Sequence, residues 1–169
     1  MDLLDFEAED LYFDEATSPA VTALLEEAAQ RYADGEAELP LLYAYLLAPR
    51  NLSVLVALYR FYYYQHRLED TLVVADHALA VAASRLGLSA DWQTLEPAQV
   101  AAAESMTLMR FYLLALKGSA YVKLRLDRLA EGEQLVDKLL SLDPADRLGC
   151  GVLKQVLRER NRLKLVVSH

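Results

Sequence analysis

The side chains that most often catalyse reactions or bind metals are few in this sequence of 169 residues. It contains three histidines and a single cysteine, Cys150. His66 and His77 fall on successive predicted helices, and two histidines alone do not complete a metal site. Adjacent carboxylates such as Glu69 and Asp70 diverge around a helix and do not converge on a substrate. With no glycine-rich phosphate loop, nucleophile elbow or paired-cysteine motif, we expect a chain that is not an enzyme and binds no cofactor.

The segment "YRFYYYQHR" at residues 59–67 has a composition suited to a different task. Tyrosine and arginine are enriched at binding hot spots, because they bury a large area at small entropic cost and keep a polar tip. The segment is therefore our best candidate for a protein-binding surface. The alternative is packing, since an aromatic stripe at helical spacing is also typical of a core, and Tyr59, Phe61 and Tyr62 fit that interpretation.

Helices must position these side chains, because apolar residues recur at helical spacing through most of the chain. Ser18 and Pro19 form a typical helix start, and Pro49 and Pro144 mark boundaries. No segment alternates with period two, so we predict an all-α fold without a sheet. The sequence predicts about seven helices, over 19–34, 40–47, 53–66, 68–86, 97–124, 128–141 and 144–162.

Charge divides the chain unevenly around a formal net charge of −8. Residues 1–48 carry twelve acidic side chains and one basic one, whereas residues 144–169 carry six basic and two acidic ones. We therefore predict an acidic segment over 1–17, with apolar side chains interleaved, and a single helical domain over 18–169. A net-acidic chain is a poor nucleic-acid binder. Without a signal peptide, a long apolar span or a disulfide framework, we expect a cytoplasmic protein that binds neither nucleic acid nor membrane.

Two predicted hairpins resemble the tetratricopeptide repeat. In the first, large and small residues between Leu55 and Ala78 follow the packing spacing of that family, and in the second, Gly118 and Tyr121 match its glycine-x-x-tyrosine. Tyr62 and Tyr121, 59 residues apart, are taken as equivalent. The resemblance implies antiparallel hairpins stacked as a short solenoid with a concave groove. It assigns six groove residues to partner binding: Arg60, Tyr63, Tyr64, Tyr112, Ser119 and Lys123.

The whole chain also resembles the small helical-repeat accessory proteins encoded with nitrogen-fixation genes, the nitrogenase-associated factor T family. The resemblance rests on "LYFDEATSP" (11–19), "APRNLSVLVALYRFYYYQHRLED" (48–70) and "GSAYVKLRLDRLAEG" (118–132). It implies a non-enzymatic protein that binds the molybdenum-iron component of nitrogenase in an immature or cofactor-compromised form and assists cofactor insertion or repair. The residues alone leave two alternatives open, a repeat-type chaperone such as a type III secretion chaperone and an oligomeric scaffold.

Overall fold

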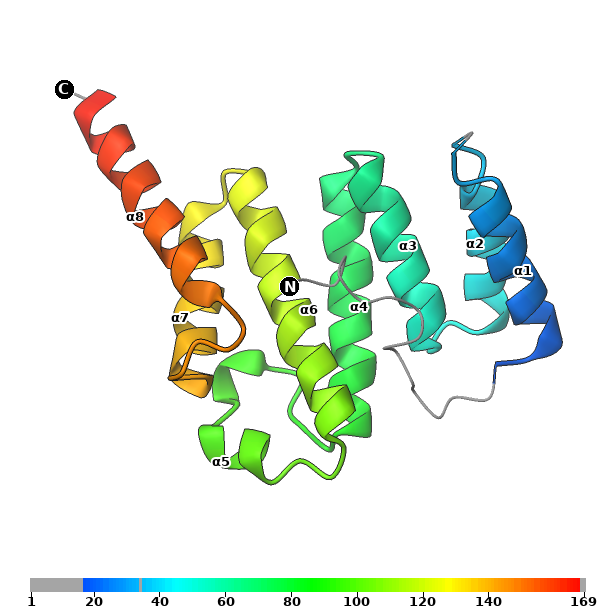
Figure 1. Cartoon of the computed structure of the whole chain (residues 1–169), viewed down its shortest axis with the longest axis horizontal. Coiled ribbons are helices and arrows are strands. Elements are labelled where there is room, and N and C mark those ends of the chain that lie inside the picture. Colours follow the sequence, from blue (N-terminus) through cyan, green and yellow to red (C-terminus); the bar gives the residue numbers. More distant parts are fainter. Residues whose placement is uncertain (1–16, 34, 168–169) are drawn as a thin grey trace.

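The computed structural model describes residues 17–33 and 35–167, and the regular secondary structure in these ranges is helical. The helices lie side by side in chain order, from α1 and α2 at one end to α7 and α8 at the other (Figure 1). This solenoid-like, all-α arrangement confirms the predicted fold class for the described residues. The acidic segment predicted over 1–17 lies outside them except for Thr17. The α-helices are α1 (Pro19–Gln30), α2 (Glu38–Leu47), α3 (Leu52–Tyr64), α4 (Leu68–Arg85), α5 (Pro97–Ala101), α6 (Met106–Arg125), α7 (Leu129–Leu142) and α8 (Cys150–Val167).

Side-chain caps fix the first residues of three helices. The Ser18 hydroxyl accepts a hydrogen bond from the Val21 amide at the start of α1. Asn51 and Ser105 do the same at α3 and α6, with N···O distances of 3.1 and 3.2 Å. Each cap satisfies a backbone amide that has no partner within the helix, so these helices begin where short polar residues precede the apolar series.

The prediction of one helix over 97–124 is wrong, because the chain breaks between α5 and α6. α5 ends at Ala101, and Ser105 caps a new helix from Met106. This break raises the number of α-helices in the described residues to eight. The helical spacing of the apolar residues continues across it, so the hydrophobic pattern alone did not reveal the cap.

The prediction that the last helix begins at 144 is also wrong. Asp146 and Gly149 have positive φ angles of 49° and 68°, which a right-handed helix cannot contain. α8 therefore begins at Cys150, where the Asp146 carboxylate accepts hydrogen bonds from the amides of Cys150 and Gly151. An acidic group at this position also complements the partial positive charge of the helix N-terminus.

The hairpins α3–α4 and α6–α7 form as predicted and share one turn geometry. The middle residue of each three-residue turn is left-handed, with φ of 58° at His66 and 61° at Asp127. In the first turn the amides of residues 65–67 donate to the carbonyls of residues 61–63. In the second turn the amides of residues 126–128 donate to the corresponding carbonyls, those of residues 122–124. Equivalent residues of the two hairpins are therefore 61 positions apart.

Ion pairs repeat at the same end of the hairpins. Arg67 Nη1 lies 2.7 Å from Glu38 Oε1 of α2, and the equivalent Arg128 Nη2 lies 2.7 Å from Glu69 Oε1 of α4. The four side chains are more than a third exposed, so each pair contributes at most about 1 kcal/mol. These ion pairs help to position the hairpins. One joins the start of α4 to the start of α2, and the other joins the start of α7 to the start of α4.

Gly132 permits the close approach of α7 to α6. A Cβ at this position would collide with the Leu124 side chain and lie 3.3 Å from the Ala120 carbonyl oxygen. Backbone so near leaves little room for the neighbour to yield. Gly132 is thus the small residue on which the second hairpin depends.

We expect Gly132→Val to destabilise the fold by about 1–3 kcal/mol, because the added methyl groups overpack this crossing. Urea unfolding followed by circular dichroism measures the loss. Ala130→Val is the matched control, since Ala130 is exposed on the same helix and the substitution carries a similar β-branching cost. Equal losses in the two variants would contradict the packing role of Gly132.

Candidate functional site

The equivalence of the two hairpins identifies which side chains share one face of the molecule. A displacement of 61 residues matches Arg60 with Tyr121 and Tyr64 with Arg125. The first helix of each hairpin therefore contributes one tyrosine and one arginine at corresponding positions. The surface formed by Tyr and Arg side chains on α3 therefore extends onto α6 of the second hairpin.

Tyr63 connects the two helices. Its ring centroid lies 6.4 Å from that of Tyr121, and the Arg125 guanidinium carbon lies 5.6 Å from the Tyr63 centroid. Burial raises the pKa of Tyr63, Tyr121 raises it further, and the Arg125 cation acts in the opposite direction. The Tyr63 ring also meets that of Tyr64, and Arg60 lines a cleft together with Tyr64. Arg60, Tyr63, Tyr64, Tyr121 and Arg125 are here called the tyrosine–arginine face.

A cleft of about 420 Å³ between α1 and α3 extends this face. Its walls are mainly apolar, with Leu25 and Ala28 from α1 and Val56 from α3, and Arg60 and Tyr64 also line it. Tyr64 is 55% exposed, and its ring meets that of Tyr32 edge to face at 6.4 Å. The cleft therefore combines apolar walls with one cation and two phenolic side chains, a composition suited to a peptide segment.

The structure does not place three of the six predicted residues on this face. Tyr112 and Ser119 are each 2% exposed, and burial raises the pKa of Tyr112 to about 12. Lys123 Nζ lies 2.5 Å from Glu131 Oε2 at the α6–α7 turn, an ion pair within the hairpin. For Ser119 and Lys123 the physical reason is register, because equating Tyr62 with Tyr121 uses a displacement of 59 residues in place of 61 and selects these residues in place of Tyr121 and Arg125. Register does not account for Tyr112, because its counterpart at the corrected displacement, Leu114, is also buried.

Tyr121 and Arg125, which the sequence reasoning missed, are recovered by the corrected displacement. A signal for it is present in the sequence as "RLED" at 67–70 and "RLAE" at 128–131. Both begin at the last residue of the turn and carry the arginine of the repeated ion pairs. The sequences of the two hairpins are therefore aligned correctly by matching their turns, and not by matching Tyr62 with Tyr121.

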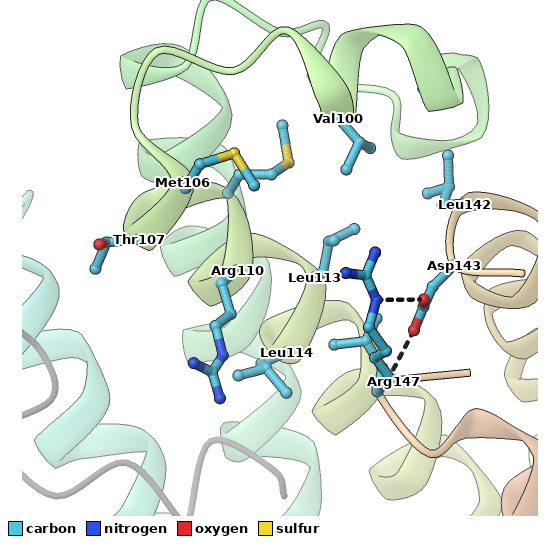
Figure 2. A pocket seen from close by; sticks show the side chains of 11 residues that line it. Val100, Met106, Thr107, Arg110, Leu113, Leu114, Leu142, Asp143 and Arg147 are labelled. Atoms are coloured by element: carbon cyan, nitrogen blue, oxygen red, sulfur yellow. Dashed lines mark hydrogen bonds and ion pairs between the residues drawn. The ribbon is translucent and has the colours of Figure 1, made fainter. Parts of the chain in front are cut away.

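Figure 2 shows a separate cavity of about 500 Å³ beside α5 and α6. Apolar side chains such as Val100, Met109 and Leu113 form most of its wall. Asp143 is engaged on both oxygens, by Arg147 Nε at 3.5 Å and by the Leu148 amide at 2.8 Å. Thr107, Arg110, Asp143 and Arg147 supply the polar part of its wall.

The side chains with intrinsic reactivity have structural roles. His77 Nδ1 lies 3.1 Å from the Tyr45 hydroxyl, in a hydrogen bond between α4 and α2. Cys150 is 1% exposed, and burial raises the pKa of its thiol to about 11. Within residues 17–33 and 35–167 no three His, Cys, Asp or Glu side chains gather as metal ligands. In the same ranges no helix combines the length and apolar character needed to cross a membrane.

Comparison with known proteins gives one informative relative. The chain is 48% identical over 163 residues to an uncharacterized 19.8 kDa protein in the nifW 5′ region of Azotobacter chroococcum mcd 1. The alignment covers 95% of this chain and 91% of the relative. No protein-family profile matches the chain, and no solved structure matches it.

We expect the Cys150 thiol to be unreactive in the folded protein. A pKa raised from 9.0 to about 11 lowers the thiolate fraction at pH 8 about 100-fold. Reaction with Ellman's reagent should therefore be at least that much slower in buffer than in urea. Because the folded pKa is the higher one, this group's contribution to stability is complete below pH 9 and declines between about pH 9 and 11. Equal rates in buffer and urea would contradict the burial.

Proposed function

The chain belongs to the family of the 19.8 kDa protein encoded in the nifW 5′ region of Azotobacter chroococcum mcd 1, and from this we propose that it is an accessory protein of nitrogen fixation. The gene position of the relative is the observation that carries the proposal. Identity of 48% along nearly the whole chain makes a shared role of the two proteins a reasonable premise.

Binding of a protein partner is the activity that the tyrosine–arginine face supports best. Tyrosine and arginine make the largest energetic contributions at protein interfaces, and here they adjoin an apolar cleft. Phenol and guanidinium groups supply directional hydrogen bonds at the edge of that apolar contact. In this proposal the side chains of the tyrosine–arginine face bind the partner and do not catalyse a reaction on it, so the proposed function is non-enzymatic.

The proposed partner is the molybdenum-iron component of nitrogenase, in an immature or cofactor-compromised form. The family resemblance motivates this choice, and the nif location of the relative is consistent with it. An accessory protein acts on such a partner by binding one conformation more tightly than another, which shifts the partner's population toward the bound form. In this way the protein would assist cofactor insertion or repair while carrying no cofactor itself.

Replacing two exposed residues of the face tests this proposal. We expect Tyr64→Ala combined with Arg125→Ala to reduce recovery of the partner at least about tenfold, the effect of losing roughly 1.4 kcal/mol of binding energy. The measurement is affinity capture of the full chain from its nitrogen-fixing host, with quantitative mass spectrometry. A parallel titration with purified molybdenum-iron protein should give tighter binding when the cofactor is absent.

Matched controls separate binding from folding. Val73→Ala combined with Arg158→Ala removes one exposed apolar side chain from α4 and one exposed arginine from α8, and should leave recovery unchanged. Both double variants should melt close to the parent temperature, because they remove exposed side chains. Absence of nitrogenase subunits from cells grown with and without fixed nitrogen would overturn the partner assignment, and capture of a secreted effector would favour the chaperone alternative.

The exposed face of α2 supports self-association as a second candidate function. Five large apolar side chains lie on this ten-residue helix and are 37–72% exposed, namely Leu39, Leu42, Tyr43, Leu46 and Leu47. A soluble protein rarely leaves so many adjacent apolar side chains in water without a partner. The charged residue of α2, Glu38, is already paired with Arg67, so the stripe is uncharged and complementary to a second copy of itself.

We expect the chain to form a dimer that Leu46→Glu dissociates. A charge placed on an apolar contact is unfavourable, so the dissociation constant should rise at least about 100-fold. Sedimentation equilibrium over a range of concentrations measures it. Val152→Glu is the matched control, because Val152 on α8 is similarly exposed, 67% against 72% for Leu46. A parent chain that is monomeric throughout would refute the scaffold candidate.

A further inference from the structure

The α1–α3 cleft, about 420 Å³ in volume, is lined by short side chains on both of its helices. Ala28 and Ala29 line it from α1, and Ser53 and Ala57 line it from α3. Leu41 of α2 also lines the cleft and is buried. The cleft is therefore a mainly apolar space bounded by three helices, and its volume lies in the range of ligand-sized pockets.

The Tyr32 side chain brings a polar atom without a partner into this space. Tyr32 lines the cleft, and its hydroxyl oxygen is buried and has no hydrogen-bond partner within the described part of the chain. Two other tyrosine hydroxyls are engaged, that of Tyr45 with His77 Nδ1 at 3.1 Å and that of Tyr62 with Glu38 Oε1 at 3.3 Å. A buried donor without an acceptor is unfavourable, so the Tyr32 hydroxyl is complementary to an acceptor supplied by a ligand.

Ring contacts hold the Tyr32 phenol in place. Its ring meets that of Phe61 edge to face at a centroid distance of 6.0 Å, and Phe61 is itself buried. The Tyr64 ring meets it edge to face from the other neighbouring position of α3, at 6.4 Å. Burial raises the pKa of Tyr32, Tyr64 raises it further, and the Arg60 cation acts in the opposite direction. The phenol is therefore protonated at neutral pH and can donate a hydrogen bond.

We propose that the α1–α3 cleft binds an exposed apolar side chain of the protein partner, of leucine or phenylalanine size, and that the Tyr32 hydroxyl donates a hydrogen bond to the partner's adjoining backbone carbonyl. The apolar walls favour a side chain that leaves water, and the carbonyl satisfies the buried donor. A peptide carries both groups next to each other, as the cleft requires. Tyr64 and Arg60 line the cleft and belong to the tyrosine–arginine face, so a segment anchored here continues across that face.

This inference rests on the proposed function, because the anchored segment belongs to the partner proposed there. Incompletely folded or assembled proteins expose apolar side chains that their mature forms bury. A cleft that binds such a side chain therefore distinguishes an immature partner from a mature one. That difference in affinity is what an accessory protein needs to act on one form of its partner.

Titration of the full chain with N-acetyl-leucine methylamide, followed by NMR, tests the cleft without nitrogenase. We expect saturable shifts of the amide signals of Ala28, Ala57 and Tyr64, with a dissociation constant in the millimolar range for so small a probe. N-acetyl-glycine methylamide has the same carbonyls without the apolar side chain and should bind at least about tenfold more weakly. Tyr32→Phe should weaken binding of the leucine probe at least about fivefold, because it removes the hydrogen-bond donor.

Thermal stability separates this role of Tyr32 from a structural one. Tyr32→Phe should leave the melting temperature unchanged or raise it, because the deleted hydroxyl has no partner among the residues that the structure describes. Tyr45→Phe is the matched control. It removes a hydroxyl that is bonded to His77, so it should lower the melting temperature and leave the affinity for the probe unchanged. A lower melting temperature of Tyr32→Phe would show that its hydroxyl stabilises the fold and would overturn the proposal.

The other outcomes are equally decisive. Equal affinity of the parent and Tyr32→Phe for the leucine probe, or shifts confined to the cavity beside α5 and α6, would overturn the proposal. Self-association that is lost in Tyr32→Phe would identify a second copy as the occupant and overturn it as well. In capture from the nitrogen-fixing host, Tyr32→Phe should reduce recovery of the partner at least about fivefold. Probe binding as expected, with no nitrogenase subunit captured, would support the cleft's ligand chemistry and refute the partner named above.

Discussion

The packing of α4 between α3 and α6 is the constraint on which the rest of the molecule depends. Short side chains, among them Ala75, Ala78 and Ala82, are buried along α4 and let a neighbouring helix approach closely from either side. Both first helices of the hairpins are thereby fixed against one central helix. Their outward faces, which carry Tyr63 and Tyr121, consequently lie close enough for the rings to meet. The candidate binding surface is a product of this packing.

The repeated turn gives that packing its register. Positive φ at His66 and Asp127 ends α3 and α6 in the same way, and the arginine that follows pairs with the glutamate at the start of the preceding unit's second helix. Individually such exposed pairs contribute little to stability. Because the two ion pairs repeat the same geometry, they keep the starts of α2, α4 and α7 aligned with one another. The solenoid-like form arises from this repetition together with the small residues at the helix crossings.

Much of the fold was predictable from local sequence, since caps and periodicity determine most helices. Ser18, Pro49 and Pro144 indicate helix boundaries from a few residues of sequence alone. Two helix starts were not predictable in the same way. α6 begins at a cap within a continuous apolar pattern, and α8 begins late because the backbone at Asp146 and Gly149 is left-handed.

The two halves of the candidate surface depend on different kinds of sequence information. Arg60, Tyr63 and Tyr64 follow from one helix, whereas Tyr121 and Arg125 require the relation between two hairpins. Two residues of register rotate a helix by about 200°, so aligning by tyrosines pointed to the buried Ser119 in place of Tyr121 and to Lys123 in place of Arg125. The turns carry this long-range equivalence, because their backbone geometry repeats and the sequences that follow them, "RLED" and "RLAE", are alike.

A rigid helical face of this kind limits what the protein can do to a partner. Moving a partner from 1% to 99% in one conformation requires a difference in binding of about 5.5 kcal/mol between its two forms. A single hot-spot side chain supplies about 2 kcal/mol or somewhat more. At least three of the five residues in the tyrosine–arginine face must therefore contact one form of the partner and lose contact with the other. Because α3 presents three of these side chains and α6 presents two, the partner must either engage all three residues of α3 or contact both helices.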